Sequence, residues 1–203
     1  MASARQGPGA GAGRLEHSGA GYNVAMDDLL AAALGQMTVL DEAGASVSLG
    51  GFWVKRPVVL AFVRHLGCIF CRQQVAGLSK RLPEIERRGG TLVVVGPAKP
   101  EHIKSFREST GYQGALFVDP GLRAFRTAGL VHGWASTYHP LSVLKGIGAM
   151  ARGFRQVGRH GDVVQQGGTF VLGPGDRVRY EWRDRYAGDN ADLDDVVEAL
   201  PSP

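Results

Sequence analysis

The sequence predicts an α/β fold in which a central mixed β-sheet is flanked by helices. Two valine-rich apolar segments, residues 56–63 and 91–97, are typical of strands buried on both faces. A helical pattern separates them, and a crossover of this length joins parallel neighbouring strands. Residues 167–184 alternate apolar and polar side chains around a Gly-Pro-Gly-Asp turn. That pattern predicts an antiparallel hairpin beside the parallel strands.

Length and composition indicate a globular protein. The chain has 203 residues, of which 44% are hydrophobic and 21% charged, so neither wholesale disorder nor a membrane protein is expected. The longest apolar run, residues 58–63, is too short to cross a bilayer. Residues 1–22 are rich in glycine and alanine and lack the apolar core of a signal peptide. We therefore expect a flexible tail over residues 1–22, a single domain over residues 23–203, and a cytoplasmic location.

Local patterns assign the elements in order. Residues 27–34 form a helical stretch with acidic residues in its first turn, and residues 36–49 predict a small hairpin that extends the fold at its N-terminus. After the first buried strand, periodic apolar residues predict a helix that Pro83 should bend and Gly89 and Gly90 should end. The remaining elements are expected as a strand at 91–97, a helix at 100–110, a strand at 114–120, a short helix at 122–130, and a final helix at 192–200.

Residues 130–165 are rich in glycine and predict an insertion before the last hairpin, with a helix beginning at Pro140. The order is therefore β-α-β-α-β, an insertion, then β-β-α. Three parallel strands followed by an antiparallel hairpin and a closing helix are the thioredoxin arrangement.

The net charge of +4 raises the question of a nucleic-acid partner. The densest basic cluster lies in the insertion, and glycines rather than aromatic side chains separate its members, which are Lys145, Arg152, Arg155, Arg159 and His160. A solvated face, or a rim for an anionic substrate, explains this composition better than a nucleic-acid site. No nucleic-acid or membrane partner is expected.

The chain contains two cysteines, Cys68 and Cys71, at the junction between the first buried strand and the following helix. Backbone N–H groups and the helix dipole favour a thiolate at this position, and the two-residue spacing allows a disulfide to close. Arg64, His65 and Arg72 add positive charges nearby. The sequence therefore favours a redox-active pair.

Two other uses of the cysteine pair fit the sequence less well. A structural zinc site needs four ligands, but there is no second cysteine pair, and His132 and His139 are seven residues apart, wider than the usual spacing. The cysteines would alternatively be buried small hydrophobic residues, which their place at a helix start disfavours. We expect neither a metal nor a cofactor.

Three segments carry a resemblance to a known family, namely residues 58–78, 116–130 and 161–189. They resemble the peroxiredoxin-like branch of the alkyl hydroperoxide reductase and thiol-specific antioxidant superfamily, over roughly residues 36–200. Typical peroxiredoxins carry Pro-x-x-x-Thr-x-x-Cys after the first core strand. Arg64 occupies the proline position here, Cys68 the threonine position, and Cys71 that of the peroxidatic cysteine.

The chain also departs from both relevant families just before the strand that begins near Thr169. Peroxiredoxins carry an activating arginine and thioredoxins a cis-proline there, whereas this chain has Gly167 and Gly168. The missing donors argue against fast general peroxidase activity unless Arg64 or Arg72 substitutes for them. We expect Gly167, Gly168 and Thr169 to form a substrate-facing loop with open space over the sulfurs, suited to a bulkier substrate.

The resemblance leaves the order of attack open. By comparison with thioredoxin, Cys68 attacks first and Cys71 resolves, whereas the peroxiredoxin alignment reverses these roles. Cys68 comes first in the turn and is expected to be the more accessible. Both alternatives end in the same Cys68–Cys71 disulfide.

The sequence as a whole predicts a thiol-dependent oxidoreductase that reduces a peroxide or a disulfide. An external thiol, either thioredoxin-like or of low molecular weight, would regenerate it, and a homodimer is left open. One alternative is a non-catalytic module that uses the fold for redox sensing or interaction. The other is a specialised biosynthetic redox enzyme that acts on one small molecule.

Overall fold

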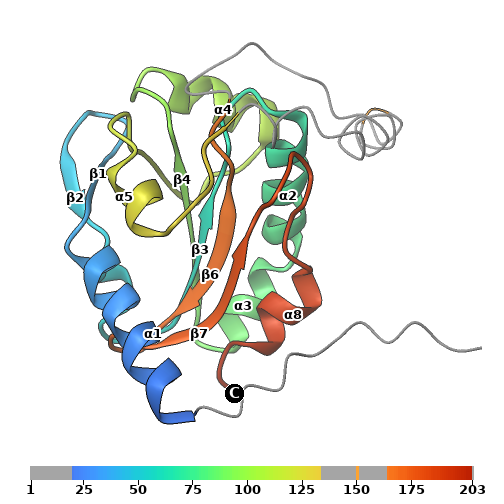
Figure 1. Ribbon diagram of the computed structural model, residues 1–203. Coiled ribbons are helices and arrows are strands. Elements are labelled where there is room, and N and C mark those ends of the chain that lie inside the picture. Colours follow the sequence, from blue (N-terminus) through green and yellow to red (C-terminus); the bar gives the residue numbers. More distant parts are fainter. Residues whose placement is uncertain (1–19, 134–149, 151–163, 203) are drawn as a thin grey trace, which may run out of the picture.

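A seven-stranded β-sheet forms the centre of the protein, as a computed structural model shows (Figure 1). The structure described here comprises residues 20–133, 150 and 164–202. The strands are β1 (Thr38–Leu40), β2 (Ser46–Ser48), β3 (Val58–Phe62), β4 (Thr91–Gly96), β5 (Ala115–Val118), β6 (Gly168–Leu172) and β7 (Val178–Arg183). The helices are α1 (Ala20–Gly35), η1 (Gly50–Phe52), α2 (Ile69–Lys80), α3 (Leu82–Arg87), α4 (His102–Thr110), α5 (Arg123–Thr127) and α8 (Leu193–Glu198).

The sheet is mixed, with strand order β2-β1-β5-β4-β3-β6-β7. Strands β3, β4 and β5 are parallel, whereas β6 and β7 form an antiparallel hairpin whose first strand pairs with β3. Every residue of β3 and of β6 is buried. Both strands are rich in aliphatic side chains because helices cover both faces of the sheet. The predicted α/β fold of the thioredoxin type is confirmed.

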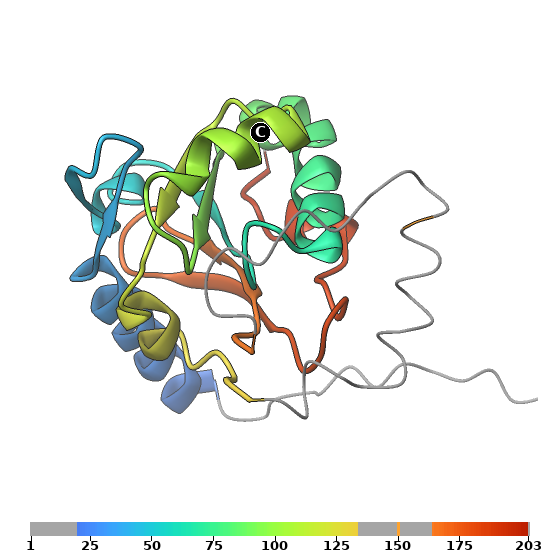
Figure 2. The same cartoon turned by 90° about the horizontal axis from the view of Figure 1, so that it is seen from above.

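Two hydrophobic clusters occupy the two faces of the sheet. One cluster packs beneath α2, α3, α4 and α8, and the other beneath α1 and α5. Viewed from above, the blue α1 and yellow α5 lie on one side of the sheet, and the green α2 and α4 lie on the other (Figure 2). Phe62 on β3 meets Phe125 of α5 edge-on, with ring centroids 5.0 Å apart. The end of β3 is thereby fixed in the core immediately before the cysteine pair.

The helix that follows the cysteines is broken rather than bent. α2 ends at Lys80 and α3 begins at Leu82, with Pro83 in the first turn of α3. Proline has no N–H to donate and clashes with the preceding turn, so it is tolerated at a helix start but not in a helix interior. The prediction of one bent helix is therefore wrong, because the segment forms two separate helices. Gly89, at φ 72°, adopts the left-handed conformation that follows the end of α3.

At the N-terminal end, α1 begins at Ala20, within the segment that the sequence assigned to a tail. Residues 20–22 are therefore helical, and residues 1–19 lie outside the described part of the chain. The predicted hairpin is confirmed, because β1 and β2 pair antiparallel, with Val39 opposite Val47. Among the described residues, no helix combines the length and apolar character that a membrane crossing requires.

The two ends of the predicted insertion are held side by side. His132 pairs with Gln165 in an antiparallel bridge, and the backbone N–H of Gln166 donates to the carbonyl of Val131 at 2.8 Å. The helix expected from Pro140 lies outside the described residues except at Met150. The predicted basic cluster also lies outside them. The base of the insertion therefore lies directly before β6.

Candidate active site

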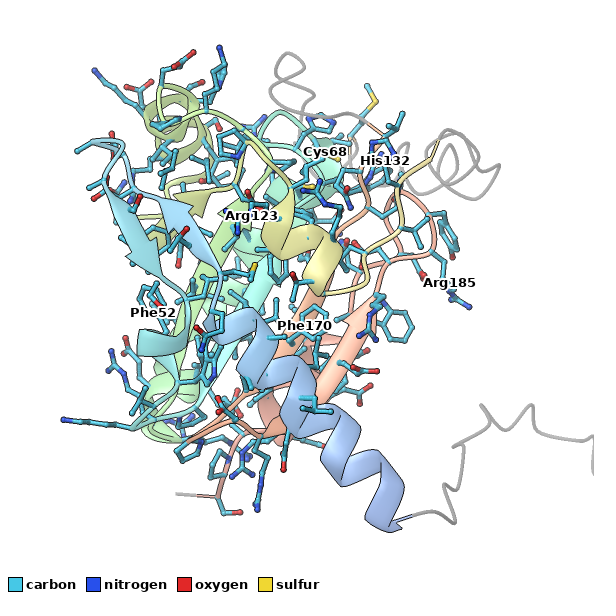
Figure 3. The ribbon with its side chains drawn as sticks, turned by 60° about the vertical axis from the view of Figure 1, so that its left-hand side comes forward. Phe52, Cys68, Arg123, His132, Phe170 and Arg185 are labelled. Atoms are coloured by element: carbon cyan, nitrogen blue, oxygen red, sulfur yellow. The ribbon has the colours of Figure 1, made fainter. Side chains whose placement is uncertain are left out.

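The cysteine pair lies where β3 passes into α2. Cys68 is the N-cap of α2, with extended backbone angles of φ −71° and ψ 129°, and Cys71 lies in the first turn. Both cysteines are free thiols in this structure. Figure 3 shows Cys68 near one end of the molecule, beyond Phe170 of the core. The predicted placement at a strand-to-helix junction agrees with this geometry, which puts both cysteines at the N-terminus of α2.

Arg64 contacts both sulfur atoms. Its backbone N–H donates to Cys71 Sγ at 3.2 Å, and its side-chain Nη1 donates to Cys68 Sγ at 3.6 Å. Only 4% of the Arg64 side chain and backbone is exposed, so the guanidinium lies within the protein beside the sulfur. A buried cation at this distance favours the negatively charged form of Cys68.

His65 supplies a second polar contact to Cys68. Its carbonyl oxygen accepts the backbone N–H of Cys68 at 3.1 Å, and its side chain hydrogen-bonds the Cys68 sulfur. Its Nδ1 atom is buried and has no hydrogen-bond partner among the described residues. The imidazole is thus held against the reactive turn.

The two sulfurs have opposite protonation preferences. A hydrogen bond from the Cys71 thiol, followed by the hydrogen bond and charge of His65 and the charge of Arg64, lowers the pKa of Cys68 well below its ordinary value despite burial. Burial, followed by the hydrogen bond and negative charge at Cys68, raises the pKa of Cys71. The arrangement therefore favours a thiolate at Cys68 and a neutral thiol at Cys71.

Solvent exposure does not distinguish the two cysteines. Each is 2% exposed, so the prediction that Cys68 is the more accessible is wrong. Both sulfurs are enclosed by the core cluster beneath α2, which includes Leu66, Ile69 and Phe70. The difference between them is electrostatic.

Arg72, the third predicted positive charge, is used elsewhere. Its Nη2 donates to the carbonyl of Ser109 near the end of α4 at 2.6 Å. Burial lowers its pKa. The sequence offered Arg64 and Arg72 as replacements for the family's missing donors. The structure shows hydrogen bonds to the cysteine sulfurs from Arg64.

The glycine pair before β6 does not leave open space. A Cβ atom on Gly167 would overlap the carbonyl oxygen of Phe62 and lie 2.8 Å from Oδ2 of Asp184. A Cβ atom on Gly168 would lie 2.7 Å from both Leu130 Cδ2 and the carbonyl oxygen of Trp182. The expectation of an open substrate-facing loop is wrong, because these glycines allow close approach of neighbouring backbone.

Thr169, expected in the same loop, is fully buried in β6. Its hydroxyl accepts a hydrogen bond from Nε2 of Gln74 at 2.9 Å. Gln74 lies one helical turn after Cys71 and was not singled out in the sequence. A polar residue on the apolar stripe of α2 is the signal that would have revealed it.

Asp184 is a second buried polar residue that sequence reasoning missed. It is 2% exposed, its backbone N–H donates to the carbonyl of Gly167, and its carboxylate borders Gly167. An aspartate after a strand is typical of an ordinary turn, so no local pattern indicated that Asp184 is buried. Within the described ranges, no group of three or more histidine, cysteine, aspartate or glutamate side chains could hold a metal ion.

Comparison with known proteins shows the family to which this chain belongs. Residues 77–186 match the model of the AhpC/TSA antioxidant enzyme family, a match that begins after the cysteine pair. The chain is 31% identical over 191 residues to thioredoxin-like protein AAED1, chloroplastic, of Arabidopsis thaliana, covering 90% of this chain and 75% of that protein. It is 33% identical to peroxiredoxin-like 2C of Mus musculus, covering 84% of this chain and 80% of the relative.

A further relative is the prostamide/prostaglandin F synthase of Salmo salar, which is 32% identical over 78% of this chain and 81% of its own length. Among solved structures, peroxidoxin BcpB of Mycobacterium tuberculosis superposes with a TM-score of 0.60 at 16% identity, covering 81% of this chain and 90% of that structure. That likeness concerns the fold. The chain belongs to the AhpC/TSA antioxidant enzyme family and to its peroxiredoxin-like branch, with a thioredoxin-type fold.

Proposed function

We propose that this protein is a thiol-dependent oxidoreductase in which Cys68 attacks a peroxide or disulfide and Cys71 resolves the product. The observation that carries the proposal is the convergence of Arg64, His65 and the Cys71 thiol on Cys68 Sγ. A thiolate is the attacking species in both reactions, and a neutral neighbouring thiol suits the resolving role. Membership of the peroxiredoxin family supports the same chemistry.

With a hydroperoxide, the Cys68 thiolate attacks one oxygen of the O–O bond. The S–O bond forms as the O–O bond breaks, leaving Cys68 as a sulfenic acid and an alkoxide that takes up a proton to become an alcohol. The Cys71 thiol then attacks the sulfenic sulfur, the S–S bond forms, and water leaves. Two equivalents of an external thiol return the pair to the reduced state as they form their own disulfide.

In this proposal Arg64 replaces the threonine and arginine hydrogen-bond donors that typical peroxiredoxins carry at other positions. Its Nη1 is 3.6 Å from Cys68 Sγ, so the same guanidinium lies beside the oxygen that departs as Cys68 is oxidised. A fixed cation at that position stabilises the charge that develops on the leaving oxygen. This role needs neither the usual threonine nor the usual arginine.

The relatives widen the range of substrates to be tested. One is named for prostamide/prostaglandin F synthesis, and others are named peroxiredoxin-like. An endoperoxide contains the same O–O bond as a hydroperoxide, so the thiolate chemistry applies to both. A cytoplasmic location and a homodimer remain predictions from the sequence.

The test uses the single variants Cys68→Ser and Cys71→Ser with a hydroperoxide, an endoperoxide and a small disulfide, each under thiol recycling. We expect Cys68→Ser to lose turnover entirely. Cys71→Ser should still consume one equivalent of peroxide and accumulate a sulfenic acid on Cys68, which a dimedone-type reagent traps for mass mapping.

A sulfenic acid that maps to Cys71 in the Cys68→Ser variant, with none on Cys68 in the other, would reverse the proposed roles. Full turnover in both variants would exclude the pair from catalysis. A pair that stays oxidised under mild reductants and turns over none of the substrates would favour the non-catalytic alternative.

A further inference from the structure

Disulfide formation changes the charge next to Arg64. The guanidinium Nη1 lies 3.6 Å from Cys68 Sγ, and the residue is 4% exposed. In the reduced protein this contact is an attraction between a cation and a thiolate, strengthened by exclusion from water. In the disulfide the sulfur carries no charge, so the attraction is lost. The loss of this attraction favours the dithiol form over the disulfide form.

The remaining contacts to the pair change in the same direction. The backbone N–H of Arg64 donates to Cys71 Sγ at 3.2 Å, and the Cys71 thiol and the His65 side chain hydrogen-bond Cys68. A disulfide has no thiol proton to donate, and its sulfur atoms are weaker acceptors than a thiolate. Each of these interactions therefore stabilises the dithiol form more than the disulfide form.

We propose that Cys68 and Cys71 form an oxidising couple, whose reduced state is favoured by Arg64 and His65, and that a carboxylate-bearing monothiol of the glutathione class regenerates it. The inference rests on the proposed function, since it concerns the regeneration of the same site. A pair stabilised as the dithiol is reduced at thiol ratios that leave a thioredoxin-like pair oxidised. A strong dithiol reductant is then unnecessary.

Burial of the sulfurs supports a small reductant. Both cysteines are 2% exposed and lie among core side chains. A protein reductant must bring its own thiol to a buried sulfur together with the surrounding loop, whereas a small monothiol requires a narrower opening. The positive charge of Arg64 also attracts an anionic thiol once the Cys68 thiolate is lost.

The regeneration step balances as follows. Two monothiols, RSH, supply two electrons and form RSSR as the S–S bond between Cys68 and Cys71 breaks. One of the two thiol protons passes to Cys71, and the other is released to solvent because Cys68 remains a thiolate. No further oxidant or reductant is needed.

The experiment measures the equilibrium between the full-length protein and a series of ratios of reduced to oxidised glutathione. After an acid quench, the dithiol and disulfide forms are counted by mass, with a thioredoxin as the reference. We expect the wild type to be mostly reduced at ratios where thioredoxin is mostly oxidised. Arg64→Met, which keeps side-chain length but removes the charge, should shift the equilibrium constant toward the disulfide by about tenfold or more, or about 30 mV.

Arg64→Lys should retain part of the effect, because it keeps the charge but not the planar guanidinium. The matched control is Lys80→Met, which removes one positive charge from the exposed last turn of α2, far from the sulfurs at the start of that helix. It should change the equilibrium constant by less than about twofold, because exposed charges at that distance are screened.

The proposal is overturned if the wild type has the same equilibrium constant as thioredoxin, or if Arg64→Met leaves the constant unchanged. If Arg64→Met fails to fold, the wild-type equilibrium constant, compared with that of thioredoxin, still tests the proposal. The equilibrium is measured without peroxide or any other oxidised substrate. A protein that turns over substrate with a thioredoxin-like potential would therefore refute this inference alone, and an oxidising couple without turnover would refute only the proposed function.

Discussion

Cys68 and Cys71 have different neighbours, although they share one helical turn and are equally buried. The guanidinium of Arg64 and the side chain of His65 are directed at Cys68, whereas Cys71 receives a backbone N–H and donates its own proton to Cys68. The pKa of Cys68 is lowered and that of Cys71 is raised as a result. These contacts favour the thioredoxin-like order of attack within a peroxiredoxin-like chain.

The sequence identified the pair and its positive neighbours but could not order the two sulfurs. The spacing of the motif fits both alignments, and the direction of a side chain such as Arg72 depends on where α4 ends in space. Likewise, the sequence suggested that Gly167 and Gly168 leave open space, because the distance between β6 and its neighbours cannot be inferred from sequence. In the fold this distance is so short that only glycine fits at the two positions.

Replacing Gly167 tests how closely its neighbours approach the backbone at the start of β6. In Gly167→Ala the added methyl group would overlap the carbonyl oxygen of Phe62, which is backbone and cannot rotate away. We expect a loss of roughly 2 kcal/mol or more in the free energy of unfolding, measured by urea denaturation.

The matched control is Gly51→Ala, since a Cβ on Gly51 meets nothing within 4 Å. Its free energy of unfolding should stay within about 0.5 kcal/mol of the wild type. Equal stability of Gly167→Ala and Gly51→Ala would contradict the close approach inferred at β6.

At the level of elements, α2 connects the cysteines to the rest of the sheet. The helix begins at the reactive turn, and one turn later Gln74 donates to Thr169 of β6 in a buried environment. That hydrogen bond holds the first turns of α2 against the strand that follows the insertion. A polar contact of this kind is specific, because either partner alone would be left unsatisfied in the core.

A double-mutant cycle tests this connection. Thr169→Val removes the acceptor and leaves the Gln74 amide buried without it, so we expect a cost of about 1–3 kcal/mol in the free energy of unfolding. Adding Gln74→Leu should recover part of that cost, giving a coupling energy of about 1 kcal/mol.

Ser79→Ala serves as the control for the cycle, because its hydroxyl only donates to the carbonyl of Val75 within the same helix. It should change stability by less than about 0.5 kcal/mol. Strictly additive effects of Thr169→Val and Gln74→Leu would show that the two side chains do not stabilise one another.

Most elements were predictable because their signals are local. Apolar periodicity located the strands and helices, and the Gly-Pro-Gly-Asp turn located the hairpin of β6 and β7. The break between α2 and α3 was predicted only as a bend, since Pro83 fits either an interior kink or the first turn of a new helix. The start of α1 at Ala20 was missed because glycine and alanine together resemble a flexible tail.

For the molecule as a whole, the parallel neighbours, the antiparallel hairpin and the thioredoxin-type arrangement followed from a few topological rules, whereas the full order of strands in the sheet was not predicted. A right-handed crossover makes β3 and β4 neighbours, and a tight hairpin makes β6 and β7 antiparallel. These constraints bring residues from β3, α2 and β6 to one end of the sheet. Asp184 could not be assigned in advance, since its burial results from packing between distant segments. Gln74 did carry a signal, because it is a polar residue on the apolar stripe of α2.

The Cys68 thiolate and the neutral Cys71 thiol can be distinguished in the intact reduced protein by alkylation with iodoacetamide as a function of pH. Peptide mapping by mass gives the rate at each cysteine in the wild type, where every contact to Cys68 is retained. Because the pKa of Cys68 is lowered, its thiolate persists below the ordinary thiol range of about 8.5, whereas Cys71 stays protonated there. We predict that Cys68 is labelled first, at a rate nearly constant between about pH 7 and 8.5, with little labelling of Cys71. Preferential labelling of Cys71, or a rate at Cys68 that rises about tenfold per pH unit across that range, would show that Cys68 is not held as the thiolate.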